Sequence, residues 1–384
     1  MMESTIQFCW QERAIATRFR VGVSLHSHTR YSEESLDVVP LYAGKIPLLT
    51  RSVRGRVRKF GDGQDQDFDF SRGFWTSPVS ALQACSLERR QIEETLQLPA
   101  LVSLTDHDDI RAGTRLRVLE QFRDLPISTE WTVPFGPTFF HLGIHNLPAA
   151  AASEVMCRLK QFTSAPDEGQ LATLLNDLNA FPDVLLVLNH PLWDEKEIGI
   201  AEHVETLNRL LESHGRSIHA LELNGLRSWK ENAEVIRLGR NIGLPPISGG
   251  DRHGLEPNAI LNLSEATCFA EFVHEVRYKH QSHILFMQQF KEPLRLRIVQ
   301  TIVDIVKDCP DEAEGRRTWS DRIYFRPGSS DQALPLSALW NSGEPFVINA
   351  VVRTLRLAEF RGVRSALRLA LHDKSFWPDQ EAAI

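Results

Sequence analysis

The sequence has few cysteines, and they are scattered along the chain. Five occur in 384 residues, at Cys9, Cys85, Cys157, Cys268 and Cys309. Their number is odd and no two form a CxxC pair, which argues against both a disulfide framework and a thiolate zinc site. A metal ion bound by this chain would therefore have nitrogen and oxygen ligands.

Long apolar runs are also missing. No stretch of about 18 apolar residues occurs, and the first 20 residues lack the apolar core of a secretion signal. The apolar fraction of 42% and the charged fraction of 24% are ordinary for a folded globular protein, which argues against disorder. We therefore expect a cytoplasmic protein without a membrane partner.

The chain carries no large excess of positive charge. Its formal net charge is −7, which gives no global attraction to nucleic acid but leaves a local basic patch open. Such a patch is RSVRGRVRKF at 51–60, which is followed by the acidic GDGQDQDFDF at 61–70. We expect an insertion at about 40–77, either a solvated loop or a lid that attracts substrate phosphate.

Short apolar runs alternate with helix-like stretches over the first three quarters of the chain. The predicted strands are 19–25, 100–104, 138–144, 184–189, 218–223 and 245–249. A helix is predicted over 78–97, with Ser77 as N-cap and Pro78 at its first position. This alternation predicts βαβ units and a mainly parallel sheet in a domain of residues 1–290. Longer helical periodicity predicts a small, mostly helical C-terminal domain over 291–384.

Potential metal ligands stand at strand after strand. They are His26 and His28 after 19–25, Asp106 and His107 after 100–104, His141 in 138–144, His190 after 184–189, Glu222 in 218–223, and Asp251 and His253 after 245–249. Alternate residues of a strand share a face, and the carboxyl ends of parallel barrel strands share an edge. These side chains are therefore predicted to converge.

One histidine at a strand end is usually a hydrogen-bonded structural residue. Six of them gathered with acids would be costly to desolvate without an ion, whereas a divalent cation binds neutral imidazole and carboxylate together. The histidines away from strand ends are expected to be structural. They are His145, His203, His214, His219, His274, His280, His283 and His372.

These residues carry a family resemblance. SLHSHTRYSEE resembles DLHxHTxxSDG, the opening motif of the polymerase and histidinol phosphatase (PHP) superfamily, and LTDHDDIRAG resembles its second motif. The remaining elements follow in family order, as Glu130, then His141 in FHLGI, His190 in LNHP, and Asp251 with His253 in GGDRH. The step from Glu130 to His141 is similar to that of stand-alone PHP phosphoesterases.

The resemblance implies an α/β fold, namely a distorted seven-stranded β/α (TIM-like) barrel with two or three divalent metal ions. The ions of this family are usually zinc, manganese or iron, and the nitrogen and oxygen ligands suit all three. The implied ligand sets are His26, His28, Glu130 and Asp251 for one ion, Glu130, His141 and His190 for a second, and Glu33, His107 and His253 for a third. Glu33 stands where the family usually has aspartate, and Glu34 replaces the glycine that follows.

The implied reaction is hydrolysis of a phosphoester by a metal-activated hydroxide. The implied catalytic groups are His26, His28, Asp106, Glu130 and His253. Asp106 either orients an imidazole or caps a strand-end turn, and Glu222 and Asn224 either support the ligands or form a polar strand terminus. Candidates for substrate phosphate are Arg30, Arg111, Arg227 and Arg252, each with a salt bridge as the alternative role.

Three functions follow as hypotheses. The first is a phosphoesterase acting on a small phosphomonoester or a nucleotide. The second is an exonuclease acting on nucleic acid ends, which the acidic net charge disfavours and the basic run at 51–59 favours. The third is a non-catalytic scaffold, stabilised by metal, whose C-terminal domain binds a partner protein. The oligomeric state is left open.

Overall fold

The computed structural model describes residues 3–11, 14–37, 70–326, 332–340, 344 and 346–371. Most of the expected insertion, including the basic run at 51–59, lies outside these residues, as does His372. Within the described ranges, no helix combines the length and the apolar character needed to cross a bilayer.

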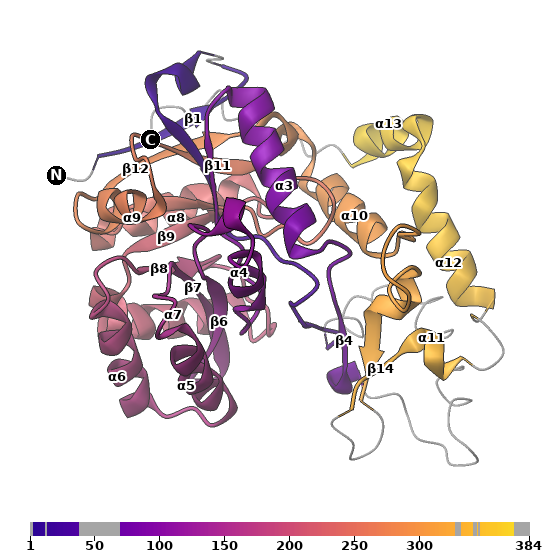
Figure 1. The fold of residues 1–384 in the computed structure, drawn as a ribbon, viewed down its shortest axis with the longest axis horizontal. Helices are drawn as coiled ribbons and strands as arrows, with labels where there is room; N and C mark the ends of the chain where they lie inside the picture. Colours follow the sequence, from indigo (N-terminus) through magenta and orange to yellow (C-terminus); the bar gives the residue numbers. More distant parts are fainter. Residues whose placement is uncertain are drawn as a thin grey trace.

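Two five-stranded sheets form the centre of the molecule (Figure 1). The first has the strand order β1-β12-β11-β2-β5 and the second has β10-β9-β8-β7-β6. Their strands are β1 (Glu3–Phe8), β2 (Val21–Ser24), β5 (Ala100–Val102), β6 (Thr129–Phe135), β7 (Thr138–His145), β8 (Leu185–Asn189), β9 (Ala220–Asn224), β10 (Pro246–Gly249), β11 (Ile260–Ser264) and β12 (Gln281–Phe286). All six predicted strands are present. Because β8 and β9 are buried throughout, both faces of the second sheet are covered at its centre.

The expected seven-stranded barrel is wrong, because the described strands form separate mixed sheets and no closed barrel. The β6–β7 hairpin turns tightly at Gly136, whose φ of +58° suits glycine, and both β6 and β8 run antiparallel to β7. In the first sheet β11 is antiparallel to both of its neighbours. Two isolated bridges, Ser27 to Arg252 and His107 to Glu130, join the strand ends of the two sheets.

A third sheet brings the N-terminal and C-terminal parts of the chain together. Its order is β14-β13-β4-β3, with β3 (Glu34–Ser35), β4 (Gly73–Trp75), β13 (Ile323–Phe325) and β14 (Leu334–Pro335). The segment after residue 291 contains helices, together with β13 and β14, which were not expected. Because β13 pairs with β4, the C-terminal segment lies close to the strand that pairs with Glu34.

Helices pack against all three sheets. The described helices are α3 (Ala81–Gln91), α4 (Arg111–Leu116), α5 (Ala152–Ser164), α6 (Glu168–Asn179), α7 (Ile200–His214), α8 (Trp229–Ile242), α9 (Phe269–Arg277), α10 (Leu294–Ile305), α11 (Leu336–Leu339), α12 (Phe346–Arg356) and α13 (Arg361–Ala370). Figure 1 shows α12 and α13 at the opposite end of the molecule from α5 and α6.

The helix expected over 78–97 begins later than predicted. Its N-cap is Ser80, which forms a capping box with Gln83, so neither Ser77 nor Pro78 belongs to the first turn. Ser77 instead makes a contact with a residue distant in sequence, because its hydroxyl donates to the carbonyl of His253 at 2.9 Å. The hydroxyl of Ser77 therefore serves a tertiary contact, and the helix begins at Ala81, later than predicted.

Candidate metal centre

The ends of β2, β5, β8 and β10 and the β6–β7 hairpin bring the predicted ligands together. Among the described residues, three groups of histidine and glutamate have ligand atoms within 4.8 Å of one another, as an ion would require. The groups are His26, His28 and Glu130; His107, Glu130 and His141; and His28, Glu34, His107 and His253. Each pair of groups shares one residue, so they form adjoining parts of one centre.

The first group surrounds one oxygen of Glu130. Glu130 Oε2 lies 3.0 Å from His26 Nε2 and 3.3 Å from His28 Nε2, and these two nitrogens are 3.1 Å apart. Asp251 Oδ1 lies 3.6 Å from His26 Nε2 and 3.5 Å from His28 Nε2. The structure thus brings together the four residues that the family resemblance implies for one ion.

The other oxygen of the same glutamate faces His141 of the second group and a further histidine, His190, whereas His107 of that group lies nearer Oε2, at 3.4 Å. Glu130 Oε1 lies 3.1 Å from His190 Nε2 and 3.5 Å from His141 Nδ1, and these two nitrogens are 3.4 Å apart. Asn189 donates from Nδ2 to Glu130 Oε1 at 2.9 Å, which fixes the orientation of the carboxylate. Glu130 therefore faces imidazoles through both of its oxygens, as a bridging ligand would.

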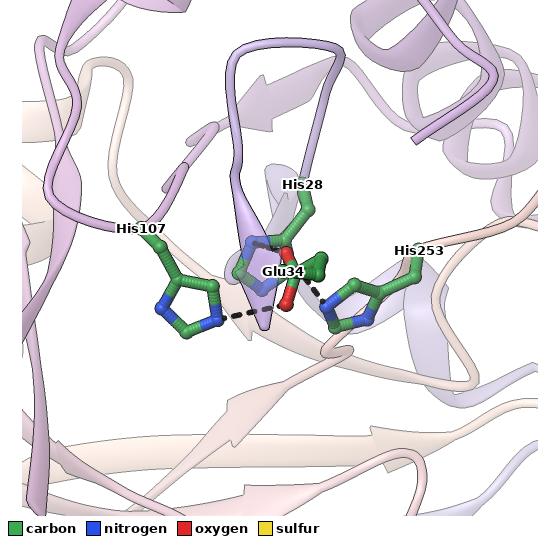
Figure 2. Close-up of side chains that lie close together, drawn as sticks. All are labelled: His28, Glu34, His107 and His253. Atoms are coloured by element: carbon green, nitrogen blue, oxygen red, sulfur yellow. Dashed lines mark ion pairs between the residues drawn. The ribbon is translucent and has the colours of Figure 1, made fainter. Parts of the chain in front are cut away.

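The third group is built on Glu34 (Figure 2). Glu34 lies between two imidazoles, with Oε1 3.2 Å from His253 Nε2 and Oε2 3.3 Å from His107 Nε2. His28 Nδ1 completes the group at 3.6 Å from Glu34 Oε1.

Glu33, the acid expected in this group, lies elsewhere. Its side chain is 48% exposed and forms an ion pair with Arg326 at 2.7 Å. Successive residues of a strand point to opposite faces, so pairing of Glu34 with Trp75 in the third sheet selects one of the two neighbouring acids. The structure thus places Glu34, the replacement for the family glycine, at the position expected for Glu33.

These distances fit divalent ions. Nitrogen and oxygen ligands at about 2.0–2.1 Å from a zinc ion, at tetrahedral or octahedral angles, lie roughly 3 Å apart, as the facing atoms do here. His107 Nδ1 is buried without a hydrogen-bond partner, 3.4 Å from Glu130 Oε2. A cation near Glu130 would satisfy this nitrogen, which is otherwise an unpaired polar atom.

The protonation of the carboxylates also suits a cation. Burial by itself would raise the pKa of Glu130, but the imidazoles of His26 and His107 outweigh burial and hold this pKa well below its usual value. Burial is likewise outweighed at Glu34, whose pKa is held well below its usual value by His107 and its neighbours. Burial lowers the pKa of His141 well below its usual value and keeps it neutral, the form that binds metal.

Three of the ligand-bearing residues have a left-handed backbone. The φ angles are +62° at His26, +28° at His190 and +52° at Asp251. Residues other than glycine rarely adopt this backbone conformation, and each such residue costs roughly 1–2 kcal/mol of folding free energy. At these strand ends, the fold holds the backbone in an unfavourable conformation that aims the side chain at the centre.

Glu222 orients two of the ligands. It accepts a hydrogen bond from His26 Nδ1 and another from the backbone N–H of His190 at 2.8 Å, which leaves His26 Nε2 facing Glu130. Asn224 donates from Nδ2 to Asp251 Oδ2 at 3.2 Å and to Glu222 Oε2 at 2.9 Å. Both residues therefore support the ligands, and carboxylates that hold a histidine in this way are common around metal sites.

Asp106 caps a turn. Its carboxylate accepts hydrogen bonds from the backbone N–H and the hydroxyl of Thr29, the latter at 2.8 Å, and the described contacts of its carboxylate include no imidazole. Burial raises the pKa of Asp106 to about 7, although the bonds from Thr29 oppose this rise. The cap ties the segment that carries His28 to the end of β5.

A cavity of about 490 Å³ opens beside the second and third groups. His107, His141 and Glu34 line it, and its cations are Arg111, Lys160 and Lys196. Cavities of about 300–1,000 Å³ are typical of small-molecule sites. The two lysines were not singled out from the sequence, because neither lies near a motif.

Of the four arginines expected to bind phosphate, Arg111 lines this cavity, where it also pairs with Asp109 at 2.7 Å. Arg252 is buried and paired with Glu88 at 2.8 Å, so its role is structural. Arg227 stacks on Trp193 with its guanidinium carbon 3.6 Å from the ring centre, and Arg30 lies 3.7 Å from Glu312.

Four histidines expected to be structural have local partners outside the three groups. His145 bonds to the hydroxyl of Ser103, His203 to the carbonyl of Pro191, and His283 to the hydroxyl of Thr5. His219 accepts from the backbone N–H of Leu186 at 3.0 Å through Nδ1, and its Nε2 donates to Asn179 Oδ1 at 2.7 Å.

His219 should make the protein less stable in acid. Burial, supported by the charge of Arg277, lowers the pKa of His219 to about 3, whereas the unfolded value is about 6.5. Between these two pKa values the unfolded chain binds a proton at His219 that the folded chain does not bind. The free energy of unfolding therefore falls as the pH is lowered from about 6.5 to about 3. We expect His219→Gln to flatten this fall by up to about 1.4 kcal/mol per pH unit, measured by urea unfolding from pH 7 to 3. Parallel curves for the two proteins would contradict the prediction.

Neither a family model nor a curated protein matches the sequence. Two solved structures resemble its fold in part. One is an amidohydrolase from Chromobacterium violaceum with bound sulfate and no metal, 14% identical, covering 60% of this chain and 87% of its own, with a TM-score of 0.34. The other is a candidate metal-dependent phosphoesterase from Bifidobacterium adolescentis, 11% identical, covering 67% and 95%, also at 0.34. At this TM-score neither likeness assigns an activity to this chain.

Proposed function

We propose that this protein is a metal-dependent hydrolase that cleaves the phosphoester bond of a small phosphomonoester or a nucleotide. The observation that carries the proposal is the sharing of ligands among three adjoining groups. Glu130 belongs to two groups and faces imidazoles through both oxygens, and His28 and His107 each present one nitrogen to each of two groups. Such sharing suits two or three ions held side by side.

Zinc, manganese or iron bound there would supply a nucleophilic hydroxide near neutral pH and neutralise charge on the phosphoryl oxygens. The chain's own residues would do the rest. Glu222 and Asn224 hold ligand side chains in place, while Arg111 and Lys196 line the cavity where they could bind oxygens of the substrate.

The cavity also distinguishes this proposal from a structural metal centre. Structural sites are closed, with all ligand positions filled by protein. Here His107 and His141 line a cavity large enough for a small molecule. This exposure favours a site that exchanges substrate and product over a scaffold.

The test combines elemental analysis with a substrate panel of phosphomonoesters, phosphodiesters, nucleotides and single-stranded oligonucleotides. We expect two or three equivalents of metal and hydrolysis of a small phosphomonoester or nucleotide that chelation abolishes and added metal restores. His26→Ala and Asp251→Ala should each lower turnover by several orders of magnitude, because metals contribute several kcal/mol to such reactions. A full complement of metal with no hydrolysis across the panel would sink the proposal.

A further inference from the structure

The C-terminal helix α10 contacts the loop that carries His253. On α10, Asp304 is buried, and its Oδ2 accepts a hydrogen bond from the backbone N–H of Leu255 at 2.8 Å. Leu255 lies two residues after His253, whose ring faces Glu34. The short segment from His253 to Leu255 therefore connects the third ligand group to α10.

Gly254 makes this contact possible. A Cβ atom at Gly254 would lie 2.6 Å from Asp304 Oδ2 and 3.1 Å from the Cβ of Asp304, closer than packed atoms allow. The side chain of Gln300, one turn earlier on α10, donates to Asp304 Oδ1 at 2.9 Å and fixes the carboxylate. The approach of helix and loop is therefore close and defined on both sides.

The same helix holds a second loop of the centre. Arg297 is buried, and its guanidinium donates to the carbonyls of Gly225 and, at 3.2 Å, Arg227, in the loop that follows β9. Gly225 in turn donates from its backbone N–H to Gly249 at 2.7 Å, at the end of β10. Helix α10 thus fixes the loop after β9, which follows Glu222, and the loop after β10, which carries Asp251 and His253.

Residues before 291 also hold the loop of His253, because Arg252 pairs with Glu88 and its carbonyl accepts from the backbone N–H of His28 at 2.8 Å. His253 is the next residue. Its backbone carbonyl accepts from Ser77, whose own carbonyl accepts from Arg316 of the C-terminal segment at 3.1 Å. Its ring nitrogen Nδ1 lies 2.9 Å from the carbonyl of Asp251 in the same loop. Part of the polar support for this ligand therefore comes from beyond residue 291.

We propose that Asp304 is a positioning residue for His253, so that the C-terminal segment completes the third ligand group. The inference rests on the proposed metal-dependent function and concerns metal binding by that group alone. Loss of the Asp304 carboxylate frees the Leu255 N–H, and the loop then no longer holds His253 opposite Glu34.

The test is a zinc titration of the full-length protein against a competing chelator, with thermal midpoints measured in parallel. For Asp304→Ala we expect one equivalent of zinc to bind about 10–100-fold more weakly, the usual effect of removing support from a metal ligand. This should be the equivalent that His253→Ala loses. Asp304→Asn should restore most of the affinity, because its amide oxygen can accept from Leu255.

The matched control is Val303→Ala. Val303 is fully buried on the same helix, so its truncation lowers the thermal midpoint but leaves the Asp304 carboxylate in place. It should leave all equivalents of zinc in place. The proposal fails if Asp304→Ala binds every equivalent as tightly as the wild type, or if Val303→Ala weakens the same equivalent equally. It also fails if His253→Ala leaves zinc binding unchanged. Failure of the proposed hydrolase would instead appear as a fully loaded protein without activity.

Discussion

Glu130→Gln will lower kcat by at least about 1,000-fold, because metals contribute several kcal/mol and each 1.36 kcal/mol is tenfold in rate. The substitution keeps the shape of the side chain but removes its charge. Glu130 faces imidazoles through both oxygens, including His26 at 3.0 Å and His190 at 3.1 Å. Two ligand groups therefore lose their shared anion at once. Steady-state kinetics on the best substrate, together with elemental analysis, measures both effects.

His145→Gln is the matched control for this variant. His145 is a buried histidine on the neighbouring strand β7, bonded to the hydroxyl of Ser103 and outside the three ligand groups. We expect it to keep its metal and to retain activity. If Glu130→Gln retained wild-type metal content and turnover, Glu130 would not be a bridging ligand.

Arg252→Met will lower the free energy of unfolding by about 3–5 kcal/mol, the usual cost of leaving one partner of a buried ion pair alone. Arg252 and Glu88 are both buried, with Nε 2.8 Å from Oε1. The guanidinium also donates to the backbone carbonyls of Gly254 and His28. Its removal leaves a buried carboxylate and two carbonyls without this donor. Urea unfolding of the two proteins measures the difference.

Arg158→Met provides the comparison on the surface. Arg158 pairs with Asp177, but both side chains are well exposed, at 39% and 49%, so its removal should cost no more than about 1 kcal/mol. Equal effects of the two substitutions would show that burial of the Arg252 pair has no energetic consequence. A loss of substrate affinity in Arg252→Met without any loss of stability would instead restore Arg252 as a phosphate-binding residue.

The strands of the fold that could be predicted are those with continuous apolar runs, such as 184–189 and 218–223. Strand β6 could not, because Glu130, Thr132 and Pro134 interrupt its sequence, and only its hairpin with β7 makes it a strand. That hairpin is also one reason why the barrel prediction was wrong. Its antiparallel pairing depends on a tight turn, which the spacing of apolar residues does not reveal. The positions of strands could thus be predicted from the local sequence, whereas the parallel or antiparallel direction of their pairing could not.

The convergence of the candidate ligands could be predicted where residue type and strand position agree. His26, His28, Glu130 and Asp251 converge because each follows or lies on a strand, and the strand ends meet at one place. The choice between Glu33 and Glu34 depended on the pairing of Glu34 with Trp75, 41 positions away, which spacing within the motif cannot show. The position of Lys196 at the cavity and the burial of Arg252 against Glu88 likewise depended on parts of the chain that are distant in sequence.

The left-handed backbone at His26, His190 and Asp251 has an evolutionary consequence. Glycine at any of these positions would relax the main chain, so a screen that rewards heat resistance alone should collect such replacements. Each of them would also delete a ligand. At these three positions the sequence therefore departs from what folding by itself would choose, and only continued selection for metal binding would keep it so.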